Sequence, residues 1–347
     1  MHSHLEKVLF LRKTQTMNYK ESQYQHQVNV LEAHHELFNM DKGNGYYKKK
    51  KYPFILENGI NNLFEPLGKN RKNRERVCQY FKDNNISWWA GYKPTGHMLS
   101  SQMACLNHLF YIRDDENAVL KLINNIRPGL QFTRVLPLPI DKDQKYIAFE
   151  AVSKYDHMNE GEPTRGANCT SIDALIVGES NDGQRWLIPI EWKFTESYPP
   201  TDKSQEDSPG RPKGNNDRGL KRLSNYSGLI NKSHYLRKYK DYAHTPYFFE
   251  PFYQLMRQTI WAEQMIEHKD SEWIKADRFL HLHVIPSDNK SLLDKEYKCT
   301  GKKMEESWRS LLLKDCYQTI TPESLLTPLK GDEKYSSLIE YLQLRYW

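Results

Sequence analysis

The chain has 347 residues, of which 38% are hydrophobic and 27% charged, and its formal net charge is +6. This composition excludes a disordered or fibrous chain and indicates a soluble globular protein of one large domain or two modest ones. The small positive excess is compatible with a polyanionic partner but does not require one.

No segment has the features of membrane insertion, secretion or disulfide bonding. The apolar run from Val8 to Leu11 is followed at once by Arg12 and Lys13, so it is too short for a signal-peptide core, and no stretch approaches the length of a membrane span. The five cysteines are odd in number and far apart, and they form no CxxC pair. A disulfide framework or a zinc ribbon is therefore disfavoured, and we expect a cytoplasmic protein with reduced thiols.

The first 94 residues are predicted to form a basic, helical extension. Residues 18–40 have the polar, Gln- and His-rich composition of a helix or a partly ordered arm, and residues 70–83 that of a basic helix. Lysines at 48–51 and basic residues between 69 and 76 form two charge clusters. Such clusters can follow a phosphate backbone, although a solvated surface explains the first cluster equally well.

The pattern changes from helix to strand in the following part of the chain. Ser100 or Ser101 can cap a helix that runs to about residue 112, and a second helix is predicted over residues 115–126. Alternating apolar residues then predict four strands, at residues 131–140, 145–153, 170–178 and 185–195. Asp182-Gly183 between the last two strands is typical of a tight hairpin.

Residues 199–218 are rich in Pro, Gly, Asp and Lys and are predicted to form a long loop. The elements expected after this loop are helices at 219–236 and 250–268, a strand at 278–286, and helices at 303–314 and 332–346. This order predicts an α/β fold with a central mixed sheet flanked by helices. We therefore divide the chain into an N-terminal extension, residues 1–94, and one α/β domain, residues 95–347.

Two apolar strands of this domain carry charged residues. Asp173 lies near the start of one strand, and Glu191 and Lys193 lie within the next. Residues two apart in a strand share a face, so Glu191 and Lys193 project together while Trp192 points into a core. Charges in such strands are costly unless they are satisfied. A salt-bridged Glu191–Lys193 pair on a half-exposed sheet is the alternative to a functional site.

These residues suit metal-dependent hydrolysis of phosphodiester bonds. The carboxylates of Asp173 and Glu191 and the backbone carbonyl of Trp192 are expected to hold a hard cation, Mg²⁺ or Mn²⁺. Such an ion polarises the phosphate and lowers the pKa of its bound water. The ammonium of Lys193 can position that water and offset negative charge. We therefore predict that Asp173, Glu191 and Lys193 are the catalytic residues.

The arrangement Asp173…Glu191-Trp192-Lys193 resembles the signature of the PD-(D/E)XK nuclease superfamily, which has the restriction-endonuclease-like fold. The chain is more closely similar to a bacterial family of uncharacterised restriction-endonuclease-like proteins, over roughly residues 95–290. The matching segments are Ser100-Ser101-Gln102, Cys105-Leu106-Asn107, Thr170-Ser171-Ile172-Asp173, Glu191-Trp192-Lys193-Phe194-Thr195-Glu196 and Tyr253-Gln254-Leu255-Met256-Arg257-Gln258.

The resemblance implies a restriction-endonuclease-like core and a metal-dependent DNA endonuclease, in a restriction, defence or repair setting. Ile172 replaces the Pro of the superfamily and Trp192 a smaller apolar residue, and the loop after Lys193 is long. These departures remove no catalytic group.

The resemblance also implies accessory groups near the catalytic residues. Glu150, in the preceding strand, could supply a further carboxylate, although a surface Glu is an equal interpretation. Glu196, three residues after Lys193, is a further accessory candidate, and an ordinary residue at the strand end is the alternative. Gln254 lies on the helix after the core strands with Arg257 and Gln258 on the same side, and an ordinary amphipathic helix is the alternative.

Basic residues that follow the site are the predicted nucleic-acid contacts: Arg211, Lys213, Arg218, Lys221 and Arg222. DNA is the expected partner, RNA is not excluded, no membrane partner is expected, and a homodimer is compatible with cutting two strands. The main alternative is a nucleic-acid-binding protein of the same fold that does not cut. A structural protein whose basic clusters are only surface is a third hypothesis, which salt-sensitive DNA binding would oppose.

Overall fold

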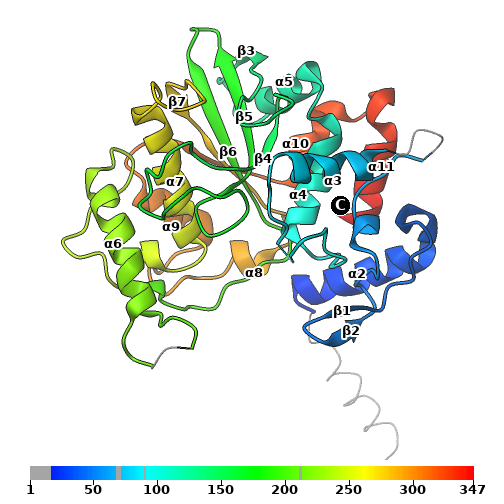
Figure 1. Ribbon diagram of the computed structural model, residues 1–347, viewed down its shortest axis with the longest axis horizontal. Helices are drawn as coiled ribbons and strands as arrows, with labels where there is room; N and C mark the ends of the chain where they lie inside the picture. Colours follow the sequence, from blue (N-terminus) through cyan, green and yellow to red (C-terminus); the bar gives the residue numbers. More distant parts are fainter. Residues whose placement is uncertain (1–16, 68–71, 90, 211–212) are drawn as a thin grey trace, which may run out of the picture.

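A mixed β-sheet forms the centre of the computed structural model, which describes residues 17–67, 72–89, 91–210 and 213–347 (Figure 1). The strands follow the order β3-β5-β6-β8-β9, with β4 also beside β5 and β7 beside β6. Their bounds are β3 Phe132–Val135, β4 Ala148–Ala151, β5 Ile172–Ser180, β6 Arg185–Trp192, β7 Arg278–Phe279, β8 His281–Val284 and β9 Tyr317–Ile320. The predicted N-terminal run at residues 8–13 and the basic residues Lys69, Arg71 and Arg211 lie outside the described residues.

The sheet is antiparallel in one half and parallel in the other. Strands β3 and β4 pair antiparallel with β5, and β5 turns into β6 through the predicted hairpin, where Gly183 adopts a φ of 76°. Strands β6, β8 and β9 run parallel, joined by segments that contain helices. The predicted mixed α/β fold is therefore confirmed.

Helices cover both faces of this sheet. In Figure 1, α6, α7 and α9 lie on one side, and α3, α4, α10 and α11 on the other. The helix bounds are α2 Tyr19–Ala33, α3 Asn73–Asp83, α4 Ser101–Leu109, α5 Glu116–Asn124, α6 Asp217–Lys232, α7 Phe252–Glu267, α8 Lys290–Leu293, α9 Met304–Leu311, α10 Pro322–Leu326 and α11 Ser336–Arg345. The Ser100 hydroxyl accepts a hydrogen bond from the Met103 amide, which confirms the predicted cap of α4. None of the described helices is long and apolar enough to cross a membrane.

Some strands differ from the sequence prediction. The predicted strand over 131–140 ends at Val135, because Pro137 and Pro139 cannot donate hydrogen bonds to a neighbouring strand. The short strand β9 was not predicted. The N-terminal part also contains an unpredicted hairpin of two strands, β1 Gly45–Tyr47 and β2 Lys50–Tyr52, besides its helices. Three-residue strands are too short to show an alternating pattern.

Candidate functional site

Three carboxylates form a row across three adjacent strands. The register of β4 against β5 places Glu150 opposite Asp173, and the register of β5 against β6, continued by one residue, places Asp173 opposite Glu191. Lys193 follows two residues after Glu191, just beyond the end of β6. The sheet thus brings together the three predicted catalytic residues and the accessory Glu150. We call Glu150, Asp173 and Glu191 the carboxylate row.

Glu191 and Lys193 are buried under helix α7, with exposed fractions of 4% and 5%. The Lys193 ammonium donates hydrogen bonds to Oε1 of Glu191 and to Oε1 of Gln254. The amide of Gln258 donates to Oε2 of Glu191. Both oxygens of Glu191 therefore accept hydrogen bonds. The predicted accessory Gln254 lies where it was expected.

Gln258 has a comparable place in the site, although it was not among the predicted site residues. Its carbonyl oxygen lies 2.8 Å from Nε2 of His281, so it links Glu191 to strand β8. Gln258 lies four residues after Gln254, so both amides are on one side of the helix. This spacing is the sequence feature from which the role of Gln258 could have been predicted. Arg257 binds Glu160 and Thr170 instead.

Asp173 and Glu150 lie at the surface of a cavity of about 540 Å³, which we call the site cavity. Oδ2 of Asp173 accepts from the Trp192 amide at 2.7 Å. Oε1 of Glu150 accepts from the Gln102 amide at 2.7 Å, and Oε2 accepts from the Ser171 hydroxyl at 2.9 Å. Two carboxylates of the row are thus oriented by neighbouring donors and accessible from the cavity.

Burial and mutual repulsion change the protonation of the carboxylate row. Burial, with the charges of Glu191 and Glu150, raises the pKa of Asp173 well above its usual range. Burial also raises the pKa of Glu150, against the hydrogen bonds from Gln102 and Ser171. Ionising all the carboxylates of the row is therefore costly, and a bound cation would lower that cost.

The ammonium of Lys193 is the positive counterpart of this row. Burial lowers the pKa of Lys193, but nearby groups, with Glu191 first, outweigh burial and hold the pKa well above its usual value. A lysine in this state remains protonated at neutral pH. Lys193 is accordingly suited to act as a fixed cation and not as a base.

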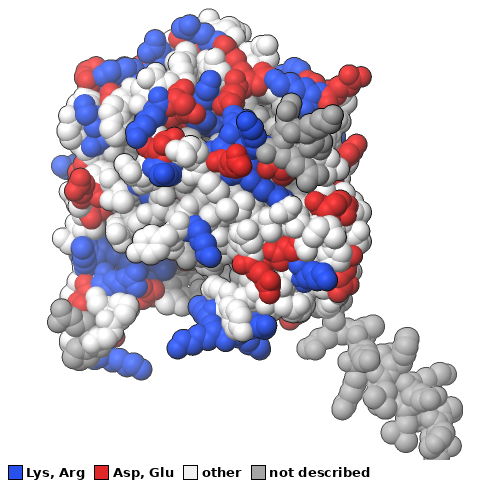
Figure 2. All heavy atoms as spheres, turned by 45° about the vertical axis from the view of Figure 1, so that its right-hand side comes forward, with Lys and Arg blue, Asp and Glu red and all other residues white. Residues whose placement is uncertain are grey.

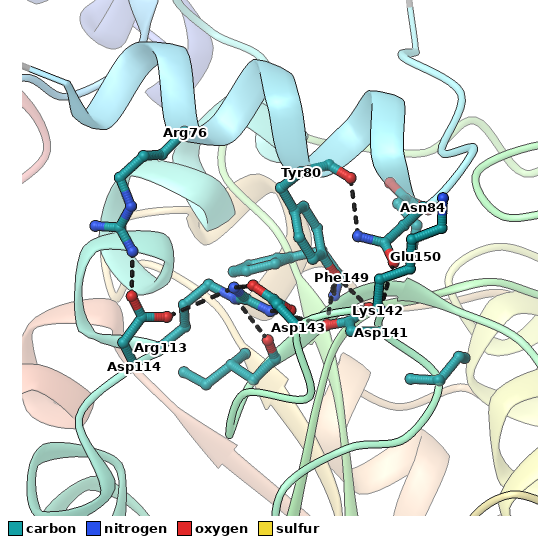
Figure 3. Close-up of polar contacts among 12 residues, drawn as sticks. Arg76, Tyr80, Asn84, Arg113, Asp114, Asp141, Lys142, Asp143, Phe149 and Glu150 are labelled. Atoms are coloured by element: carbon teal, nitrogen blue, oxygen red, sulfur yellow. Dashed lines mark hydrogen bonds and ion pairs between the residues drawn. The ribbon is translucent and has the colours of Figure 1, made fainter.

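Glu150 is held in an uncommon backbone conformation by a buried polar network (Figure 3). Its φ is 49°, in the left-handed region that non-glycine residues seldom adopt. The Tyr80 hydroxyl accepts from the Phe149 amide at 2.9 Å and donates to Asp141. The Arg165 guanidinium also donates to the carbonyls of Phe149 and Glu150. Such conformations persist where surrounding contacts determine them.

The Tyr80→Phe substitution should test this network. It removes the acceptor of the Phe149 amide and one donor to the buried Asp141 carboxylate. We expect the free energy of unfolding to fall by about 1–3 kcal/mol, the cost of leaving buried polar groups unsatisfied. Urea unfolding measures the loss. Tyr92→Phe is the control because Tyr92 is fully exposed, and equal stability of the two variants would contradict the role of Tyr80.

The other predicted residues lie around or outside this centre. Glu196 lines the site cavity, and its Oε2 accepts from the Phe194 amide at 2.6 Å. In the basic cluster, Arg218 and Arg222 pair with Glu206 at 3.7 Å and 2.8 Å. Two further members are exposed, Lys213 and Lys221. Of the four described members of this cluster, two thus share their charge with Glu206.

The donor chemistry of the carboxylate row fits a hard divalent cation, which prefers carboxylate oxygens. As they are arranged, however, no three His, Cys, Asp or Glu side chains in the described part of the chain form a group that could hold a metal ion. In the site itself, both oxygens of Glu191 accept hydrogen bonds, from Lys193 and Gln258. Asp173 and Glu150 are the carboxylates of the row that face the site cavity.

The chain was compared with protein families, curated proteins and solved structures. A family model described as "Restriction Endonuclease associating with ARP" matches residues 30–347. The match includes most of the N-terminal extension as well as the α/β domain, and so extends beyond the resemblance over residues 95–290. No curated protein and no solved structure matches the chain.

Proposed function

The chain belongs to the restriction endonuclease family whose model covers residues 30–347, and from this premise we propose that it is a metal-dependent DNA endonuclease of the PD-(D/E)XK type. The observation that carries the proposal is the row of Glu150, Asp173 and Glu191 on adjacent strands, with the Lys193 cation beside it. A purely structural ion pair at Glu191 and Lys193 would not account for two further carboxylates whose pKa values are raised.

The carboxylates are the residues that would hold the cation. Asp173 and Glu191 are the principal ligands in this proposal, with the backbone carbonyl of Trp192, and Glu150 is the accessory carboxylate. A bound Mg²⁺ or Mn²⁺ would polarise the scissile phosphate and lower the pKa of a coordinated water. The Trp192 amide orients Asp173, and Gln102 and Ser171 orient Glu150. To bind the cation, Glu191 would have to exchange a hydrogen bond from Lys193 or Gln258 for it.

Lys193 supplies a fixed positive charge in this proposal. Its protonated ammonium offsets the negative charge that grows on the phosphate during attack. Gln254 accepts a hydrogen bond from this ammonium and holds it next to Glu191. The side-chain amide of Gln258 donates a hydrogen bond to Oε2 of Glu191 and holds that carboxylate. Helix α7 thereby acts as a support that positions both charged groups.

A cleavage assay tests the proposal. Purified protein should cut DNA in Mg²⁺ or Mn²⁺ and should not cut in EDTA, with single- and double-stranded DNA of mixed sequence both offered. Asp173→Ala and Lys193→Ala should each lose cutting by roughly 10²-fold or more, because each removes a group that stabilises charge in the transition state.

The matched control is Lys298→Ala. Glu296-Tyr297-Lys298 repeats the acid-x-Lys pattern of Glu191-Trp192-Lys193, but its two charged residues are exposed. This variant should cut like the wild-type protein. If folded wild-type protein cuts no DNA or RNA with either metal, the non-cleaving nucleic-acid-binding protein becomes the better interpretation. Retained cutting in Asp173→Ala would show that the active site lies elsewhere.

A further inference from the structure

The site cavity has an aromatic wall that comes from the N-terminal part of the chain. Tyr47 of β1, Trp89 and His97 all line it, together with Asp173 and Glu150. The rings of Tyr47 and Trp89 are nearly parallel, at an interplanar angle of 19° and a centroid distance of 6.1 Å. His97 meets both rings edge-on. Aromatic side chains and carboxylates of the row thus line the same cavity.

This wall presents ring surface and little charge. Trp89 is 56% exposed, although most large aromatic side chains of this chain are buried. Burial lowers the pKa of His97 to about 4, so the imidazole is neutral at neutral pH. An uncharged aromatic surface of this kind suits the flat face of a nucleobase better than a phosphate.

One side chain connects the aromatic wall to the carboxylate row. Gln102 of α4 accepts a hydrogen bond from the Trp89 amide at 3.1 Å and donates one to Glu150 at 2.7 Å. The backbone that carries the Trp89 ring is therefore fixed relative to Glu150. A base that stacks on this ring would bring its own phosphates close to the proposed catalytic carboxylates.

The hairpin that carries Tyr47 also carries positive charge next to that ring. Its turn residues, Lys48 and Lys49, have φ values of 47° and 67°, in positions that usually hold Asn or Gly. A lysine in this conformation is strained, because its Cβ disfavours a positive φ. The Lys48 ammonium lies 5.4 Å from the centre of the Tyr47 ring. Figure 2 shows Lys and Arg side chains projecting at the lower edge of the molecule, at the height of this hairpin in Figure 1.

We propose that the site cavity binds an unpaired nucleobase against Trp89 and Tyr47, while Lys48 and Lys49 hold the adjoining phosphates. This proposal rests on the proposed function and specifies its substrate as single-stranded nucleic acid. Bases inside a duplex have both faces covered by neighbouring bases, so only an unpaired or extruded base can stack on a protein ring. The cavity volume of about 540 Å³ is within the range of small-ligand sites.

Fluorescence anisotropy with labelled oligonucleotides tests the proposal in Ca²⁺, which is chosen to avoid cutting. The probes are a single strand of roughly 20 nucleotides, its duplex and the RNA strand of the same sequence, since single-strand sites span about 4–16 nucleotides. Trp89→Ala should weaken single-strand binding by about 5- to 100-fold, and Trp89→Phe should restore most of it. Duplex binding should change little. Trp273→Ala, at an exposed tryptophan outside the cavity lining, should bind like the wild-type protein.

The double variant Lys48→Asn/Lys49→Gly separates charge from folding. Asn-Gly is the preferred sequence for this turn, so the hairpin should be at least as stable as before. The salt dependence of single-strand binding should become shallower by about 0.7 in log–log slope for each phosphate that the hairpin no longer binds. An unchanged slope would remove the hairpin from the proposed binding site.

The outcomes distinguish this inference from the proposed function. The unpaired-base site is wrong if Trp89→Ala weakens single-strand and duplex binding equally, or if it weakens neither of them. Metal-dependent cutting can still stand in both cases. If the wild-type protein cuts nothing but single-strand binding depends on Trp89, the base site stands without the nuclease. Trp89-dependent binding of only the DNA or only the RNA strand supports the site and identifies its ligand.

Discussion

Asp173→Asn is expected to abolish DNA cutting and, without metal, to make the folded protein more stable. The amide keeps an oxygen that can accept from the Trp192 amide, but it removes one of three crowded carboxylates. Because the fold raises the pKa of Asp173, its ionised form destabilises the native state at neutral pH. We expect a gain of about 1–2 kcal/mol in the free energy of unfolding. Cutting should fall by roughly 10³-fold, since metal-ion stabilisation contributes several kcal/mol.

The stability difference should depend on pH in a defined direction. A carboxyl whose folded pKa lies above its unfolded value stabilises the fold at low pH, and this contribution is lost as pH rises through the folded pKa. The gap between Asp173→Asn and the metal-free wild-type protein should therefore be small near pH 4 and widen toward neutral pH, since an unperturbed Asp titrates at about 3.9. Thermal unfolding in EDTA across this range measures it.

Added Mg²⁺ should act in the opposite sense on the wild-type protein. Metal ligands must be ionised, so the stabilisation by Mg²⁺ should grow as pH rises, and Asp173→Asn should lose most of it. Glu296→Gln is the control because Glu296 is an exposed carboxylate of another acid-x-Lys triplet. Lower stability of metal-free Asp173→Asn than of wild type would argue against a crowded carboxylate row.

The positions of the predicted catalytic residues could be predicted from the sequence, because they follow from the geometry of two strands and their turn. Alternation along a strand put Glu191 and Lys193 on one face, and the Asp-Gly turn set the pairing of β5 with β6, so Asp173 and Glu191 are neighbours. The local sequence pattern was sufficient for this prediction, because β5 and β6 are consecutive in the chain. The helix α7 was also predictable from its periodicity, and Gln254 with it.

Contacts between distant segments were not predictable in the same way. The positive φ of Glu150 depends on Tyr80 and Arg165, which lie 70 positions before and 15 after it in the chain. The aromatic wall depends on a hairpin whose strands have three residues each. No periodic signal links these segments, because tertiary packing alone brings them together.

The Arg345→Met substitution is expected to cause the largest loss of stability. Arg345, at the end of α11, is fully buried and donates hydrogen bonds to Oε1 of Gln27, to the carbonyl and side chain of Asn62, and to the Tyr341 hydroxyl. Methionine fills similar space but donates nothing, so the buried side-chain oxygens of Gln27 and Asn62 lose their donor. We expect the free energy of unfolding to fall by about 3–5 kcal/mol, because each buried acceptor left without a donor costs about 1–3 kcal/mol.

Chemical denaturation with urea measures this loss, and Arg309→Met is the control. Arg309 forms an exposed pair with Glu305 one helical turn away, and such pairs contribute about 0.3–0.5 kcal/mol. A loss in Arg345→Met no larger than in the control would show that the N-terminal part does not depend on this arginine.

Gln27 and Asn62 flank the hairpin that carries Tyr47 in the sequence. Loss of the Arg345 hydrogen bonds to these two residues should therefore also weaken single-strand binding, at temperatures where the α/β core remains folded. Arg345 would thus connect the proposed base site to helix α11.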